Sequence, residues 1–186
     1  MALMHTPVCD VGLAAPDFQL LGVDGKQWTR DECTGENGLL VMFICNHCPY
    51  VKAIQQRLVA DVKDLQDNAI GVVAIMSNDP NDYPEDAFEN MQQVAKDKGY
   101  HFPYLIDPTQ QVAKAYGAIC TPDFFGYNAK LELQYRGRLD ESGKQQNVGD
   151  VKRDLLDAML LIAKTGTGPS EQIPSMGCSI KWRSPN

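Results

Sequence analysis

The sequence has neither an excess of positive charge nor a long apolar run. Its 17 lysine and arginine residues against 24 aspartate and glutamate residues give a formal net charge of −7 at pH 7, which argues against a nucleic-acid-binding surface. The longest uncharged apolar runs, 38–45 and 158–163, fall far short of the roughly 18 residues that indicate a membrane span. We therefore expect neither a nucleic acid nor a membrane among its partners.

Cysteine is also scarce. Six cysteines in 186 residues amount to roughly 3 %, well below the 8–10 % or so that marks a disulfide-stapled secreted scaffold. The first ten residues contain no basic segment, and Pro7 and Asp10 interrupt any apolar stretch, so they do not resemble a secretory signal. We expect a cytoplasmic protein, in which most thiols stay reduced unless they are catalytic.

The apolar residues predict alternating strands and helices, without internal repeats or low-complexity tracts. Continuous apolar runs at 39–44 and 70–76 predict strands that are buried on both faces. Apolar residues at helical spacing over 51–65 and 87–95 predict amphipathic helices. Further expected elements are a short strand running to a turn at 24–25, a strand at 102–106, a brief helix capped by Thr109 and ending at Tyr116, a hairpin of 123–127 and 131–135, and a helix over about 148–164.

This order of elements predicts an α/β fold. Strands that alternate with helices favour a mixed, mostly parallel sheet with helices on both faces. At about 150 residues per domain, the length predicts one domain with something added. We expect a single domain over 1–165, followed by a tail over 166–186 that packs on it, because the composition shifts to Gly, Pro, Ser and Thr after Gly166.

A pair of cysteines lies where the first buried strand gives way to a helix. Chemistry in such sheets sits at the carboxyl ends of the strands, and this end carries Cys45-Asn46-His47-Cys48. Free N–H groups and the positive end of the helix dipole stabilise a thiolate. We expect Cys45, beside the helix N-cap, as the exposed attacking thiol. Cys48, one turn further on, is expected as the buried resolving thiol.

His47 lies between the two cysteines and is expected to tune them. A partly protonated imidazole beside a thiolate favours the reduced form and makes the disulfide a stronger oxidant. We therefore predict a reduction potential above about −270 mV and below about −120 mV. Pro49 fits the first turn of the helix, which has few N–H groups to lose.

A metal site is the alternative for the same residues. Cys45, His47 and Cys48 include two kinds of zinc ligand, so a metal-binding or redox-sensing module is a second interpretation. A zinc knuckle needs a second Cys/His pair, whereas His101 and Cys120 stand apart as single residues. The redox pair is therefore favoured, and it implies neither a metal nor an organic cofactor.

A CxxC motif at a strand-to-helix junction, with Thr121-Pro122 just before a hairpin, resembles the thioredoxin superfamily. The segments 12–20 and 105–117 are similar to the alkyl hydroperoxide reductase/thiol-specific antioxidant (AhpC/TSA), or redoxin, branch. The whole chain is similar to small bacterial thioredoxin-like proteins with a Cys-Asn-His-Cys-Pro motif and a Gly-Cys-Ser/Thr-Ile-Lys-Trp tail, here 177–182.

The resemblance implies a thioredoxin-like fold with a redoxin-type insertion at 84–106. It also implies a cis peptide bond before Pro122 and a substrate chain held at Thr121 and Pro122. The corresponding activity is thiol–disulfide exchange with disulfide-containing protein substrates and an upstream thiol reductant.

A thiol-dependent peroxidase that uses Cys45 is the alternative within the same branch. Its site would read Pro-x-x-x-Thr-x-x-Cys, but Met42 and Gly38 lie three and seven residues before Cys45. Counting back from Cys48 does not give this pattern either. The strand before Cys45 also lacks the buried carboxylate that assists proton transfer in thioredoxin, so the proton acceptor is unassigned.

The remaining cysteines have two interpretations each. Cys120, two residues before Pro122, is either an accessory redox thiol or a small buried apolar residue. The tail is expected to fold back, to pack Ile180 and Trp182 over the domain and to bury Cys178, whereas a regulatory disulfide at Cys178 is the alternative. Cys9 and Cys33 lie in expected loops and have no partner that the sequence names.

The basic residues near the hairpin, Arg136, Arg138 and Lys144, are expected on a solvated face. Tyr50 and the two phenylalanines Phe124 and Phe125 could line a shallow groove beside the disulfide, although core packing is favoured for the phenylalanines.

Overall fold

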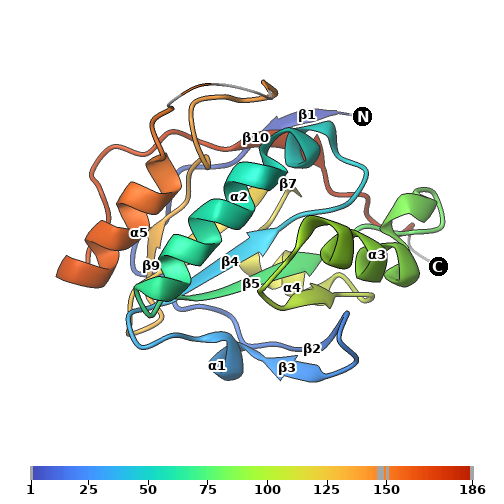
Figure 1. The fold of residues 1–186 in the computed structure, drawn as a ribbon, viewed down its shortest axis with the longest axis horizontal. Coiled ribbons are helices and arrows are strands. Elements are labelled where there is room, and N and C mark those ends of the chain that lie inside the picture. Colours follow the sequence, from blue (N-terminus) through green and yellow to red (C-terminus); the bar gives the residue numbers. More distant parts are fainter. Residues whose placement is uncertain (1, 146–148, 150, 185–186) are drawn as a thin grey trace.

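A computed structural model of the chain describes residues 2–145, 149 and 151–184 (Figure 1). The strands are β1 (Leu3–His5), β2 (Gln19–Gly22), β3 (Gln27–Thr29), β4 (Leu39–Phe43), β5 (Gly71–Met76), β6 (Tyr104–Ile106), β7 (Cys120–Thr121), β8 (Asp123–Tyr127), β9 (Leu133–Tyr135) and β10 (Met176–Ser179). The helices are α1 (Arg30–Cys33), α2 (Pro49–Asp67), the 3₁₀ turn η1 (Pro84–Asp86), α3 (Phe88–Lys98), α4 (Gln111–Tyr116) and α5 (Asp154–Thr165).

The central sheet has the strand order β3-β2-β6-β5-β4-β8-β9. Its centre is parallel, because α2 carries the chain from β4 to β5 and α3 carries it from β5 to β6. The other four neighbouring pairs are antiparallel. The α/β fold and the mixed sheet are confirmed. The expectation of a mostly parallel sheet is wrong, because a hairpin extends each edge.

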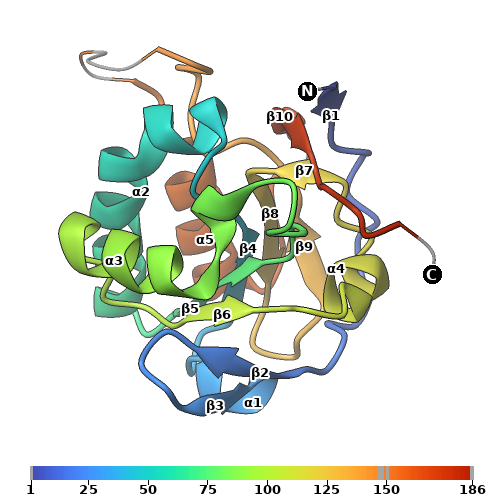
Figure 2. The same ribbon diagram turned by 90° about the vertical axis from the view of Figure 1, so that its right-hand side faces the viewer.

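Both faces of the sheet are covered, as the continuous apolar strands predict. Along β4, Leu40 and Met42 point into one core, which α2, α3 and α5 complete. Leu39, Val41 and Phe43 point into the other core, which receives side chains from α1 and α4. Figure 2 shows the helices on the two sides of the sheet. This arrangement leaves the carboxyl ends of β4 and β5 side by side at one edge.

The two ends of the chain meet in a second, three-stranded sheet of order β1-β10-β7. The tail strand β10 lies between β1 and β7 and is antiparallel to both. Both ribbon views show these three strands next to one another (Figures 1 and 2). The tail thus packs against β7, the strand that leads into Pro122.

Most helix and strand positions agree with the sequence pattern, and two helix starts do not. The N-cap of α4 is Gln110, with a left-handed φ of 62°, where Thr109 was expected. Helix α5 begins at Asp154, whereas the pattern predicted a start near 148. Residues 146–148 lie outside the described part of the chain. Within that part, no helix is long and apolar enough to cross a membrane.

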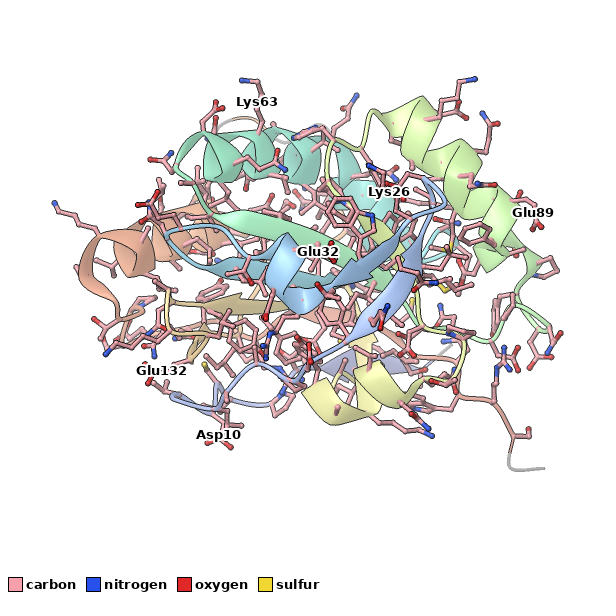
Figure 3. The ribbon with its side chains drawn as sticks, turned by 90° about the horizontal axis from the view of Figure 1, so that it is seen from below. Asp10, Lys26, Glu32, Lys63, Glu89 and Glu132 are labelled. Atoms are coloured by element: carbon pink, nitrogen blue, oxygen red, sulfur yellow. The ribbon has the colours of Figure 1, made fainter. Side chains whose placement is uncertain are left out.

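The charged residues are spread over several elements. Figure 3 labels six of them, Asp10, Lys26, Glu32, Lys63, Glu89 and Glu132, whose side chains project outward from different parts of the chain. All are exposed except the half-buried Glu132.

Candidate active site

The CxxC motif lies in the connection between β4 and α2. Strand β4 ends at Phe43, and Cys48 is the N-cap residue of α2, with Pro49 as the first helical residue. Cys45 therefore lies three residues before the N-cap along the chain, and its side chain neighbours that of the N-cap residue Cys48. Pro49 suits the first helical position because it has no N–H to lose there. The free N–H of Val51, in the same first turn, lies near Cys48 and lowers its pKa.

Thr121 lies against both sulfur atoms. Cys45 Sγ is 3.3 Å from Thr121 Oγ1, and Cys48 Sγ, when protonated, donates to the carbonyl oxygen of Thr121 at 3.1 Å. The bond between Thr121 and Pro122 is cis, as the resemblance implies. The structure thus brings Cys45, Cys48, Thr121 and Pro122 together. That Thr121 and Pro122 hold a substrate chain stays a prediction.

Both sulfurs are enclosed in this structure. Cys45 is 2 % exposed and Cys48 is 0 % exposed. The expectation of an exposed Cys45 is therefore wrong, whereas the burial of Cys48 is confirmed. The physical reason is the segment around Asp86, which folds over the motif and binds its backbone.

The two thiols differ strongly in acidity. Burial raises the pKa of Cys45 well above its usual range, and the hydrogen bond to Cys48 and the charge of Asp86 add to the rise. The hydrogen bond from Cys45 lowers the pKa of Cys48 to about 4 against the effect of burial, with help from the backbone N–H groups of Val51 and Cys178. Cys48 is therefore the more acidic of the two thiols.

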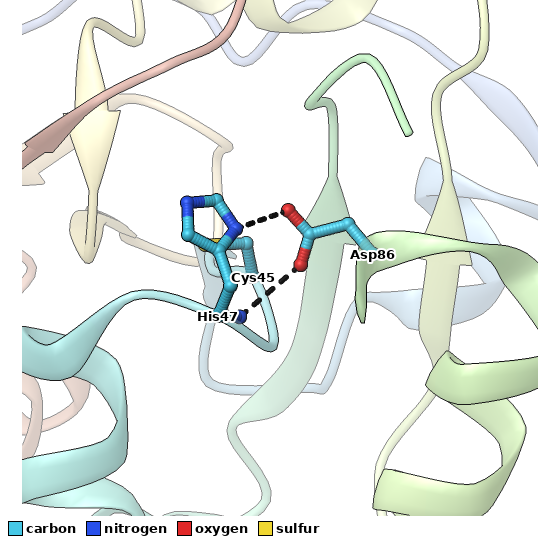
Figure 4. A group of neighbouring side chains, drawn as sticks. All are labelled: Cys45, His47 and Asp86. Atoms are coloured by element: carbon cyan, nitrogen blue, oxygen red, sulfur yellow. Dashed lines mark hydrogen bonds and ion pairs between the residues drawn. The ribbon is translucent and has the colours of Figure 1, made fainter. Parts of the chain in front are cut away.

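Asp86 organises the connection from the other side (Figure 4). Its side chain is fully buried. Its Oδ1 accepts from the backbone N–H groups of Asn46 at 2.8 Å and His47 at 3.2 Å. Its Oδ2 lies 2.6 Å from His47 Nδ1 and accepts from Asn78 Nδ2 at 2.8 Å. Although burial raises the pKa of Asp86, the hydrogen bonds from His47 and Asn78 hold it below the ordinary value.

Stacking on an aromatic ring also fixes the imidazole of His47. The ring stacks on Tyr83, with 4.4 Å between the ring centroids, and its Nε2 is buried with no hydrogen-bond partner among the described residues. Tyr104 fixes the neighbouring position by donating from its hydroxyl to Asn46 Oδ1 at 3.0 Å. His47 is therefore a fixed part of the motif, in contact with a buried carboxylate.

Sequence reasoning missed Asp86, and with it a buried carboxylate near Cys45. The turn residues 77–82 and the insertion at 84–106 were recognised, but they were not connected with the motif. A signal was available, because the carboxyl ends of adjacent parallel strands meet at one edge of a sheet. An acidic residue soon after the second buried strand was therefore a candidate neighbour of Cys45.

Cys45, His47 and Asp86 form a group whose potential ligand atoms all lie within 4.8 Å of one another. The metal site considered from the sequence consisted of Cys45, His47 and Cys48, so this group has Asp86 in place of Cys48. The carboxylate already accepts four hydrogen bonds, one of them involving His47 Nδ1. Only Cys45 Sγ and His47 Nε2 remain available, and catalytic zinc sites use three protein ligands. The arrangement fits a metal poorly.

The tail reaches this site through β10. Cys178 is 4 % exposed and lies opposite Thr121 in the antiparallel pairing. Burial of Cys178 and Ile180 by the tail is confirmed. Trp182, however, is 42 % exposed, so the expectation that it packs over the domain is wrong. Its ring lies over Lys114 at the surface, 5.7 Å from Nζ.

The other three cysteines have features of inert thiols. Cys120 is fully buried, its Sγ is 3.8 Å from the carbonyl oxygen of Pro122, and burial raises its pKa far above the ordinary value. Burial also raises the pKa of Cys33, at the end of α1, to about 12, and that of the half-buried Cys9 to about 11. These positions favour the structural interpretation of Cys120.

Arg136 does not lie on a solvated face. It is 8 % exposed, pairs with the fully buried Asp123 at 2.9 Å and lies over the ring of Phe125 at 4.4 Å. The expectation was wrong because Arg136, directly after β9, turns its side chain inward onto Asp123 and Phe125. Burial nevertheless raises the pKa of Asp123 to about 6, against the hydrogen bond from Arg136. Arg138 is partly buried against Asp154, at 2.7 Å.

A mainly apolar pocket of about 270 Å³ opens beside the cis proline. Pro122, Phe124, Tyr50 and Met176 contribute to its lining. Phe124 is buried within the core and also lines this pocket, so the groove and core interpretations both hold for it. The exposed Lys144 places Nζ 4.4 Å from the ring centroid of Tyr50 at the rim.

Comparisons with known proteins agree with this geometry. The AhpC/TSA family model matches residues 11–142. An uncharacterized conserved protein from Geobacillus kaustophilus is 41 % identical over 100 % of this chain and 99 % of its own, with a TM-score of 0.94. A hypothetical protein from Sinorhizobium meliloti 1021 is 40 % identical over 97 % and 99 %, with a TM-score of 0.91.

A more distant structure shows the same fold. The thiol:disulfide interchange protein, a thioredoxin family protein from Chlorobium tepidum TLS, is 19 % identical over 82 % of this chain and 96 % of its own, with a TM-score of 0.61. No curated protein matches. With its thioredoxin-like fold and a family match over most of its length, the chain belongs to the AhpC/TSA family.

Proposed function

We propose that this protein is a thiol–disulfide oxidoreductase that reduces or exchanges disulfides in protein substrates through Cys45 and Cys48. The observation that carries the proposal is the convergence of the two sulfurs on Thr121, at 3.3 Å and 3.1 Å, next to cis Pro122. The Chlorobium relative is by its description a thiol:disulfide interchange protein, which supports the same chemistry.

Cys45 is the nucleophile in this proposal, because it keeps 2 % of its surface exposed whereas Cys48 keeps none. In the first step the Cys45 thiol passes its proton to the neighbouring Cys48, the more acidic thiol, in its thiolate form. Cys45 Sγ then attacks one sulfur of the substrate disulfide. The Cys45–substrate bond forms, the substrate disulfide breaks, and its other sulfur leaves as a thiolate.

Cys48 resolves the mixed disulfide. The departing thiolate takes the proton from Cys48, and the Cys48 thiolate attacks Cys45 Sγ. The Cys45–Cys48 bond forms and the second substrate sulfur leaves, so the substrate gains the two electrons that the pair loses. An upstream thiol reductant restores the pair. The same residues run the reaction in reverse when the substrate is a dithiol.

His47 and Asp86 are positioning residues in this scheme. The carboxylate holds the two backbone N–H groups of the connection and the imidazole together, so the loop that carries Cys45 has a fixed conformation. Its negative charge also raises the pKa of Cys45. The pair therefore keeps its proton on Cys45 until a substrate arrives.

Trapping of the mixed disulfide tests the proposal. In Cys48→Ser the resolving step is blocked, so the reduced variant should form a stable covalent adduct through Cys45 with a disulfide-containing protein such as insulin. Cys120→Ser is the matched control, because it removes a buried thiol beside Pro122 and leaves the Cys45–Cys48 pair intact; it should release reduced insulin like the wild type. If Cys48→Ser forms no adduct while the wild type consumes hydrogen peroxide rapidly, the protein is instead a thiol peroxidase.

A further inference from the structure

Three thiols, not two, surround Thr121. Cys45 Sγ contacts its hydroxyl at 3.3 Å, and Cys48 Sγ contacts its carbonyl oxygen at 3.1 Å. Cys178 lies directly opposite Thr121 in the pairing of β10 with β7. All three cysteines belong to one buried apolar cluster, and Cys178 and Cys48 lie close enough for each thiol to shift the pKa of the other.

The position of Cys178 is held by the backbone. The Ile180 N–H donates to the Ile119 carbonyl at 3.0 Å, which fixes the register next to Cys178. Gly177 lies so close to β7 that a Cβ there would be 2.0 Å from the carbonyl oxygen of Thr121. Ser175 donates from its hydroxyl to the Pro122 carbonyl at 2.8 Å. The tail strand thus carries Cys178 to the active-site sulfurs and keeps it there.

The reduced state protects Cys178 from ionising. Burial raises its pKa to about 11, and the hydrogen bond and charge of Cys48 contribute to the rise, whereas Lys181 and Lys144 oppose it. When Cys48 enters a disulfide it carries no charge, so two of the causes of the rise disappear. Cys178 therefore becomes more reactive when the neighbouring pair is oxidised.

We propose that Cys178 is a third redox thiol, which takes over the active-site disulfide by attacking Cys48. The Cys178–Cys48 bond forms, the Cys45–Cys48 bond breaks, and the electron pair of that bond stays on Cys45 Sγ, which receives the proton lost by Cys178. The step is an isomerisation of the oxidised protein and needs no further oxidant. It rests on the proposed function, because thiol–disulfide exchange supplies the Cys45–Cys48 disulfide.

The product differs from the ordinary oxidised pair in two ways. The Cys48–Cys178 disulfide ties the tail strand to the N-cap of α2, and Cys45 returns to the thiol state while the protein is still oxidised. Cys120 is not equivalent to Cys178. It is paired with Ser179 rather than with Thr121, and its Sγ lies 3.8 Å from the Pro122 carbonyl oxygen.

Disulfide mapping of Cys45→Ser tests the proposal in a protein that cannot form the Cys45–Cys48 disulfide. The full-length variant is treated with oxidised glutathione, alkylated in denaturant, digested and analysed by mass spectrometry. We expect glutathione to attach to one of Cys48 and Cys178 and the other thiol to displace it, which gives an intramolecular Cys48–Cys178 disulfide. The matched variant Cys45→Ser/Cys120→Ser should form the same bond, and Cys45→Ser/Cys178→Ser should keep the glutathione adduct.

The wild type provides a second test that does not depend on the variants. After oxidation by glutathione disulfide, native alkylation should label Cys45, and mapping should find part of the disulfide between Cys48 and Cys178. The proposal is overturned if folded Cys45→Ser keeps only a glutathione adduct, or if all the wild-type disulfide joins Cys45 to Cys48. Failure of the proposed function gives a different pattern, in which the wild type forms no Cys45–Cys48 disulfide and reduces no insulin.

Discussion

Replacing Asp86 with asparagine removes a single charge from the centre of the site. The carboxylate is fully buried and accepts four hydrogen bonds, from the backbone of Asn46 and His47, from His47 Nδ1 and from Asn78 Nδ2. An asparagine oxygen can keep the two backbone bonds. Its NH₂ group, however, then faces His47 Nδ1 and Asn78 Nδ2, which both donate to the carboxylate. Of these two groups only the imidazole can become an acceptor, by carrying its proton on Nε2 instead of Nδ1.

The expected loss follows from these bonds. One to two charge-assisted hydrogen bonds disappear, at about 1.5–3 kcal/mol each, so Asp86→Asn should lower the free energy of unfolding by about 1.5–6 kcal/mol. At roughly 2–4 °C per kcal/mol for a chain of this size, the melting temperature should fall by about 3–24 °C. Urea and thermal unfolding of the reduced protein measure both quantities. Asp82→Asn makes the same charge change at an exposed position of the same segment and should stay within about 0.5 kcal/mol of the wild type.

A second readout separates the electrostatic role of Asp86 from a structural one. The carboxylate raises the pKa of Cys45, so its removal should bring the onset of Cys45 alkylation by iodoacetamide to lower pH. A stability change within about 0.5 kcal/mol, or an alkylation profile identical to that of the wild type, would refute the reasoning.

Three further predictions concern Thr121, Gly177 and Asp123. Thr121→Val should move Cys45 alkylation to higher pH, because the hydroxyl lowers the pKa of Cys45, whereas Thr121→Ser should not; a profile unchanged in the valine variant would count against this contact. Gly177→Ala should lower the free energy of unfolding by about 1–3 kcal/mol, because its Cβ would meet the carbonyl oxygen of Thr121. Urea unfolding measures the change, and Gly149→Ala, where a Cβ meets nothing within 4 Å, is the control; equal effects would contradict the close approach. Asp123 has a folded pKa of about 6 against an ordinary 3.8, so the folded state holds an extra proton between these values. Its contribution to stability, on the order of 2–3 kcal/mol, should be present below about pH 4 and be lost as the pH rises through about 6. Asp123→Asn should abolish that slope in urea unfolding, and a slope that persists would contradict the shift.

The parts of the fold that follow from local pattern could be predicted. The apolar run of β4 and the helical spacing of α2 place the CxxC motif at a strand-to-helix connection, as observed. The resemblance added the cis peptide bond before Pro122. Both kinds of information concern short segments whose geometry is set by their own residues or by a shared motif.

What could not be predicted depends on contacts between distant segments. Asp86 binds the motif 40 residues before it, and the sequence pattern indicates only that an acidic residue after the second buried strand lies near the same edge of the sheet. The enclosure of Cys45 follows from that contact. The burial of Arg136 likewise depends on Asp123 and Phe125 across a hairpin, and Cys178 meets Cys48 only because β10 pairs with β7. The cytoplasmic location and the reduction potential stay predictions.

The central claim is that Cys45 and Cys48 exchange disulfides. Its most direct test is a stopped-flow comparison, in which the fully reduced protein is mixed with insulin or with hydrogen peroxide at equal concentrations and the product is mapped. The account predicts faster oxidation by the protein disulfide, through an adduct at Cys45 that is resolved by Cys48. Faster oxidation by peroxide, with a sulfenic acid at Cys45 and no reduced insulin, would contradict it.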